Sequence, residues 1–317
     1  MVSLTLLTML TSLFPLPSFA IVYYHVHPTC TEKPAMTEAI KEAIHMARRV
    51  YDRMWANDAD IQKLLSRIFK IEHKSGAAWN EVLSVMGGIG SAQPKDVREA
   101  NTHIYCDGDQ RWQFLENEWF DMSPETSIML YGSRVPQFWM KNTPRCRPEY
   151  RGDNYAVTYI SQGQIGPLTH PKDNSITICA PYCDAEYTTI EKSVNDLWLD
   201  TPLSDTTKNS TRTKKLLGPN GLASITLLHE FTHLVDFDKI DHVPAYHWNN
   251  VIEKSAENAL INADNYAYLG LLVLLGDYRI KLDDDETRSY AGYLVKTEET
   301  YVKHNSKEWP LGNSTSK

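Results

Sequence analysis

Two histidines and a glutamate in the C-terminal half of the chain have the types and spacing that bind zinc and activate water. They stand as His229-Glu230-Phe231-Thr232-His233. Because residues i and i+4 lie on one face of a helix, one turn apart, both imidazoles can reach a single tetrahedral metal ion. Glu230 lies about 100° round the helix, where it can contact a metal-bound water without ligating the metal. Zinc would lower the pKa of that water towards ~7 and polarise a scissile carbonyl, and Glu230 would pass the water's proton to the leaving amine.

The residues that carry this motif are predicted to form a buried helix. Residues 222–237 have helical character, and residues 222–228, which precede the motif, are largely apolar. A His-Glu-His face would be costly in a core helix without a metal, because its polar groups would be removed from water. We therefore expect a bound zinc ion rather than an exposed polar helix face, with His229 and His233 as ligands and Glu230 as general base.

A catalytic zinc needs a third protein ligand and one open position. The metzincin pattern requires a histidine six residues after His233, where Lys239 stands, and a downstream methionine, but no methionine follows Met140. The chain is therefore not a metzincin. The thermolysin-like pattern requires a glutamate farther along the chain, where Glu253 stands, followed by Glu257 in place of the preferred aspartate. A third pattern places an aspartate shortly after the motif.

The residues after the motif fit the third pattern. They include Asp241, Ala245-Tyr246-His247-Trp248 and the segment 259–268, which reads ALINADNYAY. Together with the motif they resemble the deuterolysin group of aspzincin metalloendopeptidases, a mainly fungal group that includes peptidyl-Lys metalloendopeptidases. The resemblance covers residues 222–275 well and residues 30–69 loosely.

In that family the third zinc ligand is the aspartate of a Gly-Thr-x-Asp-x-x-Tyr segment, and the tyrosine steadies the transition-state oxyanion. The resemblance implies Asp241 as the third ligand and Tyr246 as the oxyanion donor. This chain lacks the Gly-Thr pair, and Asp241 stands five positions before Tyr246 instead of three. Without a gap the ligand position falls on Val243, which cannot bind zinc. Three alternatives stay open: an insertion in the loop, His242 as the ligand, or loss of catalysis.

Asp264 has two compatible interpretations. It can cap the N-terminus of an apolar helix predicted over residues 266–275, which Gly276 would end. It can also be an acid that orients a ligand histidine from behind. The resemblance of its Asn-Ala-Asp-x-Tyr segment to the family favours the second interpretation.

The rest of the chain predicts an α+β fold. Apolar residues recur at three- and four-residue spacing on both sides of the polar residues 57–60, which predicts a packed helix pair. The β-branched, apolar segments 155–160 and 175–180 predict strands. We expect a zincin-like metalloprotease domain with a small sheet packed on the active-site helix and helix-rich flanks. It would form one enlarged domain over residues 21–303, with an irregular insertion at residues 74–150. A pro-segment within the first hundred residues is the alternative.

The start of the chain predicts export. Residues 2–20 carry no charged side chain, and they end in Pro17-Ser18-Phe19-Ala20, with small residues at the positions that precede a signal-peptidase cut after Ala20. We interpret residues 1–20 as a secretory signal peptide. The last residues, 304–317, are expected to form a flexible tail.

Two further patterns accord with an exported glycoprotein. All five cysteines lie after the predicted signal peptide, so an oxidising compartment would give two disulfides and one remaining thiol. Asn209-Ser210-Thr211 and Asn313-Ser314-Thr315 are N-glycosylation sequons. The pairing cannot be deduced from the sequence. The cysteines are Cys30, Cys106, Cys146, Cys179 and Cys183.

Composition and charge limit the classes of partner that the protein is expected to bind. The formal net charge is −8 and there is no basic cluster, which argues against nucleic-acid binding. After residue 20, no apolar run reaches the ~18 residues needed to span a bilayer. We therefore expect a secreted, extracellular monomer that acts on protein or peptide substrates. The alternative is a secreted, antigen-like zinc-binding protein that has lost catalysis, although a sequestering site would have no need of Glu230 as a base.

Overall fold

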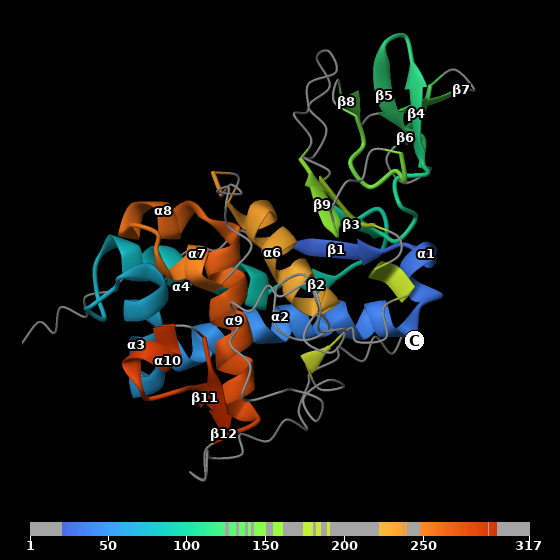
Figure 1. Ribbon diagram of the computed structural model, residues 1–317. Coiled ribbons are helices and arrows are strands. Elements are labelled where there is room, and N and C mark those ends of the chain that lie inside the picture. The colour runs from blue at the N-terminus through green and yellow to red at the C-terminus, as the bar shows by residue number, and fades with distance from the viewer. Residues whose placement is uncertain are drawn as a thin grey trace, which may run out of the picture.

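A helical body packs against a mixed β-sheet in the computed structural model (Figure 1). The structure describes residues 21–123, 127–130, 133–136, 139–140, 143–149, 155–160, 174–179, 182–184, 189–190, 222–236, 238–239, 248–290 and 292–296. The predicted signal peptide, the predicted tail and both sequons lie outside these residues and stay predictions. The single-domain interpretation of residues 21–303 is likewise untested.

The helix pair predicted near the N-terminus is present as α2, Pro34–Trp55, and α3, Ala59–Phe69. Asp58 caps α3 by accepting hydrogen bonds from the N–H groups of Asp60 and Ile61 at 2.8 and 3.3 Å. The apolar residues that recur in both helices are largely buried, so the periodicity marks the face that each helix turns to the core.

The prediction that residues 74–150 are irregular is wrong in its first part, because Ala77–Gly90 forms the buried helix α4. Its glycine-rich end is a helix–helix contact. A Cβ added to Gly90 would lie 2.8 Å from the Arg48 Cα on α2, so the absence of a side chain lets the two helices approach closely. Arg48 also donates two hydrogen bonds to the Gly90 carbonyl oxygen. Close packing therefore explains Gly90.

The central sheet has five strands. Four neighbouring strands are parallel, and the fifth strand, at one edge, runs antiparallel to its neighbour. The segments predicted as strands, 155–160 and 175–180, are confirmed as β9 and β10. In spatial order the strands are β2 (Gln93–Pro94), β1 (Tyr23–Val26), β3 (Thr102–Tyr105), β10 (Asn174–Ile178) and β9 (Ala156–Tyr159).

The predicted motif helix is confirmed as α6, Ala223–Val235, which packs against α2, α9 and the edge strand β9. Thr158 on β9 contacts α6 and lies opposite Ile176 on β10. Successive side chains of a strand alternate between the two faces of the sheet. We call the side that carries Thr158 and Ile176 the α6 face. The opposite side, which carries Ser175 and Thr177 of β10, is the outer face.

Helix α9, Ala263–Asp277, is buried along almost its whole length and lies beside α6. Its Gly270 faces α6 so closely that an added Cβ would lie 2.3 Å from the Leu228 Cδ2. The two helices that bear the motif and Asp264 are therefore held at short range by the absence of a side chain at residue 270.

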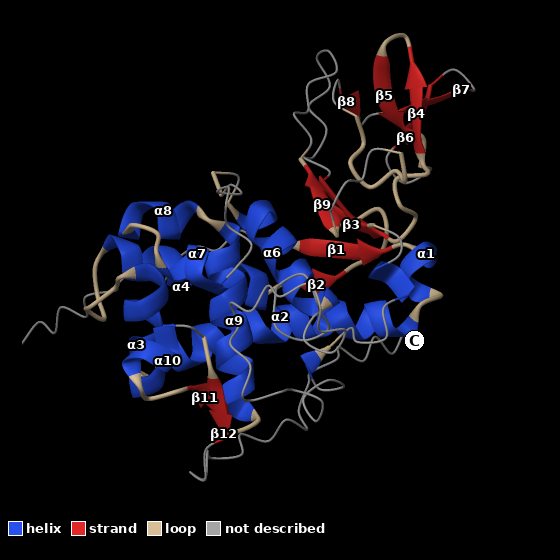
Figure 2. Cartoon of the chain, viewed as in Figure 1, coloured by secondary structure: helices blue, strands red, loops and turns tan. Residues whose placement is uncertain are grey.

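The remaining elements surround this core, and the strands β4, β5 and β8 lie beyond the end of the central sheet (Figure 2). The α+β class is thereby confirmed, and none of the described helices is long and apolar enough to cross a membrane. The other helices are α1 (Pro28–Thr31), η1 (Tyr182–Asp184), α7 (Trp248–Ile252), α8 (Ala256–Ile261) and α10 (Glu286–Tyr290). The other strands are β4 (Trp112–Leu115), β5 (Glu118–Asp121), β6 (Ser127–Leu130), β7 (Ser133–Pro136), β8 (Trp139–Met140), β11 (Ile280–Leu282) and β12 (Leu294–Lys296).

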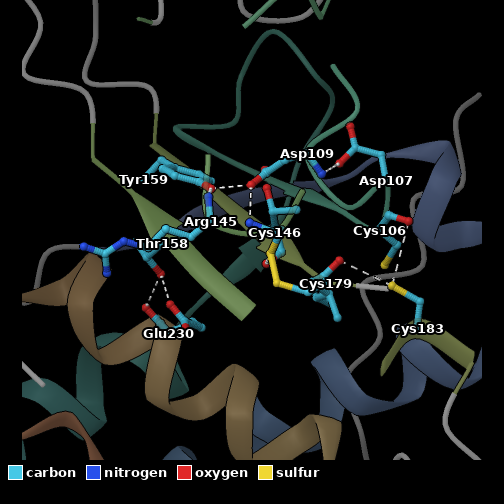
Figure 3. Close-up of a disulfide and its surroundings, with 12 residues drawn as sticks. Cys106, Asp107, Asp109, Arg145, Cys146, Thr158, Tyr159, Cys179, Cys183 and Glu230 are labelled. Carbon is cyan, nitrogen blue, oxygen red and sulfur yellow. Dashed lines mark hydrogen bonds between the residues drawn. A yellow bond between two sulfur atoms is a disulfide. The ribbon is translucent and has the colours of Figure 1, made fainter. Parts of the chain in front are cut away.

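The cysteines form the predicted two disulfides. Cys30 bonds to Cys106. Cys146 bonds to Cys179 (Figure 3). The fifth residue, Cys183, keeps its thiol, is buried and donates to the Ile178 carbonyl oxygen at 3.5 Å. The expectation of two bridges and one thiol is therefore confirmed.

Candidate metal centre

Helix α6 brings the two motif histidines together in the interior. The ring centroids of His229 and His233 lie 4.9 Å apart at an interplanar angle of 70°. His229 is 7% exposed and Glu230 is 6% exposed, so the motif lies on a helix packed into the core, as predicted. The structure thus places both predicted histidine ligands and the predicted base on adjoining faces of one buried helix.

The first histidine is oriented by the acid that the sequence singled out. The Nδ1 of His229 lies 2.8 Å from the Asp264 Oδ1, and Asp264 is fully buried. The interpretation of Asp264 as an N-cap is wrong, because α9 begins at Ala263 and Asn262 occupies the cap position. Its interpretation as an acid behind a ligand histidine agrees with the observed contact.

The second histidine is oriented by a backbone carbonyl. The Nδ1 of His233 lies 3.0 Å from the carbonyl oxygen of Lys239, in the turn that follows α6. A carbonyl oxygen only accepts hydrogen bonds, so His233 donates from Nδ1. In each neutral ring the proton therefore sits on Nδ1, and Nε2 carries the lone pair.

The two Nε2 atoms face each other. They lie 3.2 Å apart, so two lone pairs meet at hydrogen-bond distance. Such an arrangement is repulsive unless a positive charge, either a proton or a metal ion, lies between the atoms. Two imidazoles on one tetrahedral zinc, with Zn–N bonds near 2.05 Å, have their nitrogens about 3.3 Å apart. The donor set and its spacing therefore fit zinc.

The acid behind His229 adds a second indication of a cation. The Asp264 Oδ2 is buried and has no hydrogen-bond partner within the part of the chain that the structure describes. Burial and the nearby Asp264 carboxylate raise the pKa of Tyr268 well above its ordinary value. A buried carboxylate with one unsatisfied oxygen is costly unless a positive charge lies close by. A cation held by His229 would supply that charge.

Comparisons of the chain with protein-family models, curated proteins and solved structures found no match. The resemblance to the deuterolysin group therefore rests on the motif residues alone. It stays a prediction.

The predicted base contacts the edge of the sheet. Thr158 Oγ1 donates to the Glu230 Oε2 at 2.6 Å and lies 3.1 Å from the Glu230 carbonyl oxygen (Figure 3). The role of Thr158 was not predicted from the sequence. No local signal could have done so, because the strand and the helix that it joins are far apart in the chain.

The candidates predicted as the third ligand in the loop lie outside the described residues. Asp241, His242 and Tyr246 fall within the segment 240–247, which the structure does not describe. Glu253 is exposed and accepts a hydrogen bond from the Tyr290 hydroxyl at 2.6 Å. Within the described ranges no group of three or more His, Cys, Asp or Glu side chains could hold a metal ion, so Glu253 does not join the histidine pair there.

Proposed function

We propose that the chain is a secreted zinc metalloendopeptidase that hydrolyses peptide bonds in extracellular proteins. His229, His233 and Asp241 bind the metal, Glu230 is the general base and Tyr246 stabilises the oxyanion. The observation that carries the proposal is the 3.2 Å approach of two Nε2 atoms whose rings both donate from Nδ1. Such a pair is preorganised to accept a metal ion.

The chain leaves α6 beside the histidine pair and then continues into the segment that carries the predicted ligand Asp241. The Lys239 carbonyl oxygen is 3.0 Å from the His233 Nδ1, and Asp241 follows two residues later. The separation of Asp241 from Lys239 is thus only two positions in the sequence. Glu253, the thermolysin-like candidate, instead faces Tyr290. These contacts favour a ligand from the loop over Glu253.

Each side chain of the centre has one task in peptide hydrolysis. When bound, zinc would acidify a water molecule and polarise the substrate carbonyl. Asp264 and the Lys239 carbonyl hold the Nδ1 protons and so direct both Nε2 lone pairs inward. Glu230 takes the proton of the attacking water at Oε1 and returns it to the leaving amine, while Thr158 fixes Oε2.

Export to an oxidising compartment is part of the proposal. The two disulfides persist where thiols are not kept reduced. They accord with the signal peptide predicted at residues 1–20 and with the sequons. We propose that the enzyme acts outside the cell as a monomer.

A secreted zinc-binding protein without turnover is the second candidate. It is favoured by one contact, because the Thr158 hydroxyl engages the Glu230 carboxylate at 2.6 Å. If that contact persisted in the zinc-loaded protein, it could hold the base on the strand and away from substrate. The two candidates share the metal centre and differ in the role of Glu230.

Proteolysis of unfolded casein separates the candidates. We expect the zinc-loaded chain to cleave casein, o-phenanthroline to abolish cleavage, and Glu230→Ala to abolish it while zinc stays bound. A wild-type chain that binds zinc and cleaves no protein would favour the second candidate. A chain that binds no zinc would contradict both.

A further inference from the structure

Lys239 is a buried lysine in the turn that follows α6. Its side chain is 1% exposed. The Nζ atom pairs with Glu81 of α4 and lies 2.9 Å from an Asp236 carboxylate oxygen at the end of α6. It also lies 5.4 Å from the ring centroid of Tyr266 on α9. One ammonium group therefore ties the turn to three helices.

The buried ammonium group of Lys239 is paired with carboxylates. A buried ammonium is costly unless it is paired, and Glu81 and Asp236 both pair with it. Burial on its own would raise the pKa of Asp236, but hydrogen bonds from Lys239 and from the Asp238 N–H outweigh it, so the pKa lies below its ordinary value. Burial, Glu81 and Asp236 raise the pKa of Tyr266 well above its ordinary value. The ammonium thus meets two carboxylates and a neutral aromatic ring.

The backbone of the same residue faces the metal centre. The Lys239 N–H donates to the Asp236 carbonyl oxygen at 3.1 Å and closes the turn. The Lys239 carbonyl oxygen accepts from the His233 Nδ1 at 3.0 Å. The side chain and the carbonyl of one residue therefore act on opposite sides of the turn.

We propose that Lys239 is the positioning residue of the metal centre. Its ammonium group, fixed between α4 and α6, holds its own carbonyl where it sets the orientation and tautomer of His233. The inference rests on the proposed function, since it concerns the same histidine. The position at which a metzincin carries its third histidine is used here to orient the second one.

Zinc affinity of the full chain tests the role of the side chain. Lys239→Met keeps the length of the apolar stem and removes the charge. Glu81 and Asp236 can then be hydrated, because their side chains are 40% and 30% exposed, so we expect the variant to fold. Loss of an interaction behind a ligand weakens metal binding about 10- to 100-fold. We expect this loss in competition with a chromophoric chelator, and we expect Lys239→Arg to recover most of the affinity.

A matched control separates positioning from general stability. Arg53 is also a buried cation, 7% exposed, and pairs with Asp58 at 2.9 Å. It lies next to Gly276, about 18 Å along α9 from Asp264. Arg53→Met should lower the melting temperature and leave zinc affinity unchanged. An equal loss of affinity in the two variants at equal loss of stability would overturn the proposal.

The tautomer of His233 gives a readout that needs no metal. In metal-free protein, nitrogen chemical shifts should show the proton of His233 on Nδ1 in the wild type and a mixture of tautomers in Lys239→Met. An Nδ1 tautomer together with wild-type zinc affinity in the variant would overturn the proposal. A wild-type chain that binds no zinc would instead contradict the proposed function, and the tautomer measurement would still decide the role of Lys239.

A second variant covers the case in which Lys239→Met does not fold. Glu81→Gln removes one of the two charges that hold the ammonium and changes a partly exposed side chain. We expect a smaller loss of zinc affinity, about 3- to 10-fold, within the range of weakened contacts behind a ligand. Unchanged affinity in this variant would overturn the proposal.

Discussion

The two faces of the central sheet bury charge in opposite ways. On the outer face, the Arg111 guanidinium lies 2.8 Å from Asp121, 2.9 Å from Asp107 and 3.5 Å from Asp109. It also donates to the Thr177 hydroxyl at 2.9 Å. The cation and the carboxylates therefore occur together, although the Asp109 Oδ1 has only this ion pair and no hydrogen-bond partner among the described residues.

The α6 face instead brings acceptors together. His229 and His233 direct two Nε2 atoms at each other, and the Asp264 Oδ2 has no hydrogen-bond partner in the described part of the chain. A cluster that contains its own cation stabilises the fold, whereas one that concentrates acceptors is suited to bind a cation.

Removing the cation of the outer face should have the largest effect on stability. Arg111→Met leaves the buried carboxylates of Asp121 and Asp109 without their shared partner, which costs about 3–5 kcal/mol. The free energy of unfolding in urea measures the loss. His229→Gln in metal-free protein is the matched change on the α6 face. We expect a smaller loss, about 1–2 kcal/mol, because it weakens the hydrogen bond to the buried Asp264 but also separates two facing acceptors. Equal losses for the two variants would contradict the comparison.

Acid should weaken the outer face next. His103 is 1% exposed, and burial, followed by the charge of His25, lowers its pKa to about 4. Asp121, Arg111 and His27 also face it, and Asp121 opposes the shift. As the pH falls from 6.5 to about 4, the unfolded chain takes up a proton that the folded chain refuses. Stability that is present above pH 6.5 is therefore lost over this window, by at most about 3 kcal/mol.

The pH dependence of unfolding checks this assignment. His103→Gln should flatten the fall in urea stability between pH 6.5 and 4. It should not abolish the fall, because burial and Arg49 also lower the pKa of His45 to about 4. The same slope in the variant and the wild type would show that His103 does not cause the loss of stability.

A smaller effect is expected where the sheet touches the base. Thr158→Val keeps the shape of the side chain and removes the hydroxyl that donates to Glu230 at 2.6 Å. Loss of a hydrogen bond to a charged group costs about 1.5–3 kcal/mol. We therefore expect kcat/KM on casein to fall roughly 10- to 100-fold. Thr158→Ser should restore the rate, and zinc affinity should stay constant across the series. A faster Thr158→Val enzyme would show that the contact inhibits Glu230 instead of orienting it.

The regular elements were predictable where the side-chain pattern is periodic. Helices α2, α3 and α6 and strands β9 and β10 all agree with their apolar spacing. Helix α4 was missed because its glycines, among them Gly90 in close contact with Arg48, look like loop residues in a sequence. Its neighbour on α2 is far away in the chain, so no local pattern could reveal the reason for Gly90.

The centre was predictable only along the motif. The spacing of His229 and His233 and the resemblance around Asp264 identified residues that the structure brings into contact. The roles of Thr158 and Lys239 could not be predicted because they depend on tertiary contacts. Thr158 contacts α6 from the sheet edge, and Lys239 contacts α4. A strand threonine and a loop lysine have no spacing that marks such a role.

The most direct test of the account is anomalous diffraction at the zinc edge from crystals of the full chain grown with zinc. The account predicts one strong peak bonded to the Nε2 atoms of His229 and His233, with an Asp241 carboxylate oxygen as the third protein ligand. His242 as the third ligand would keep the metal centre and correct the loop. Zinc bound elsewhere, with the two Nε2 atoms still facing each other and no metal between them, would contradict the central claim.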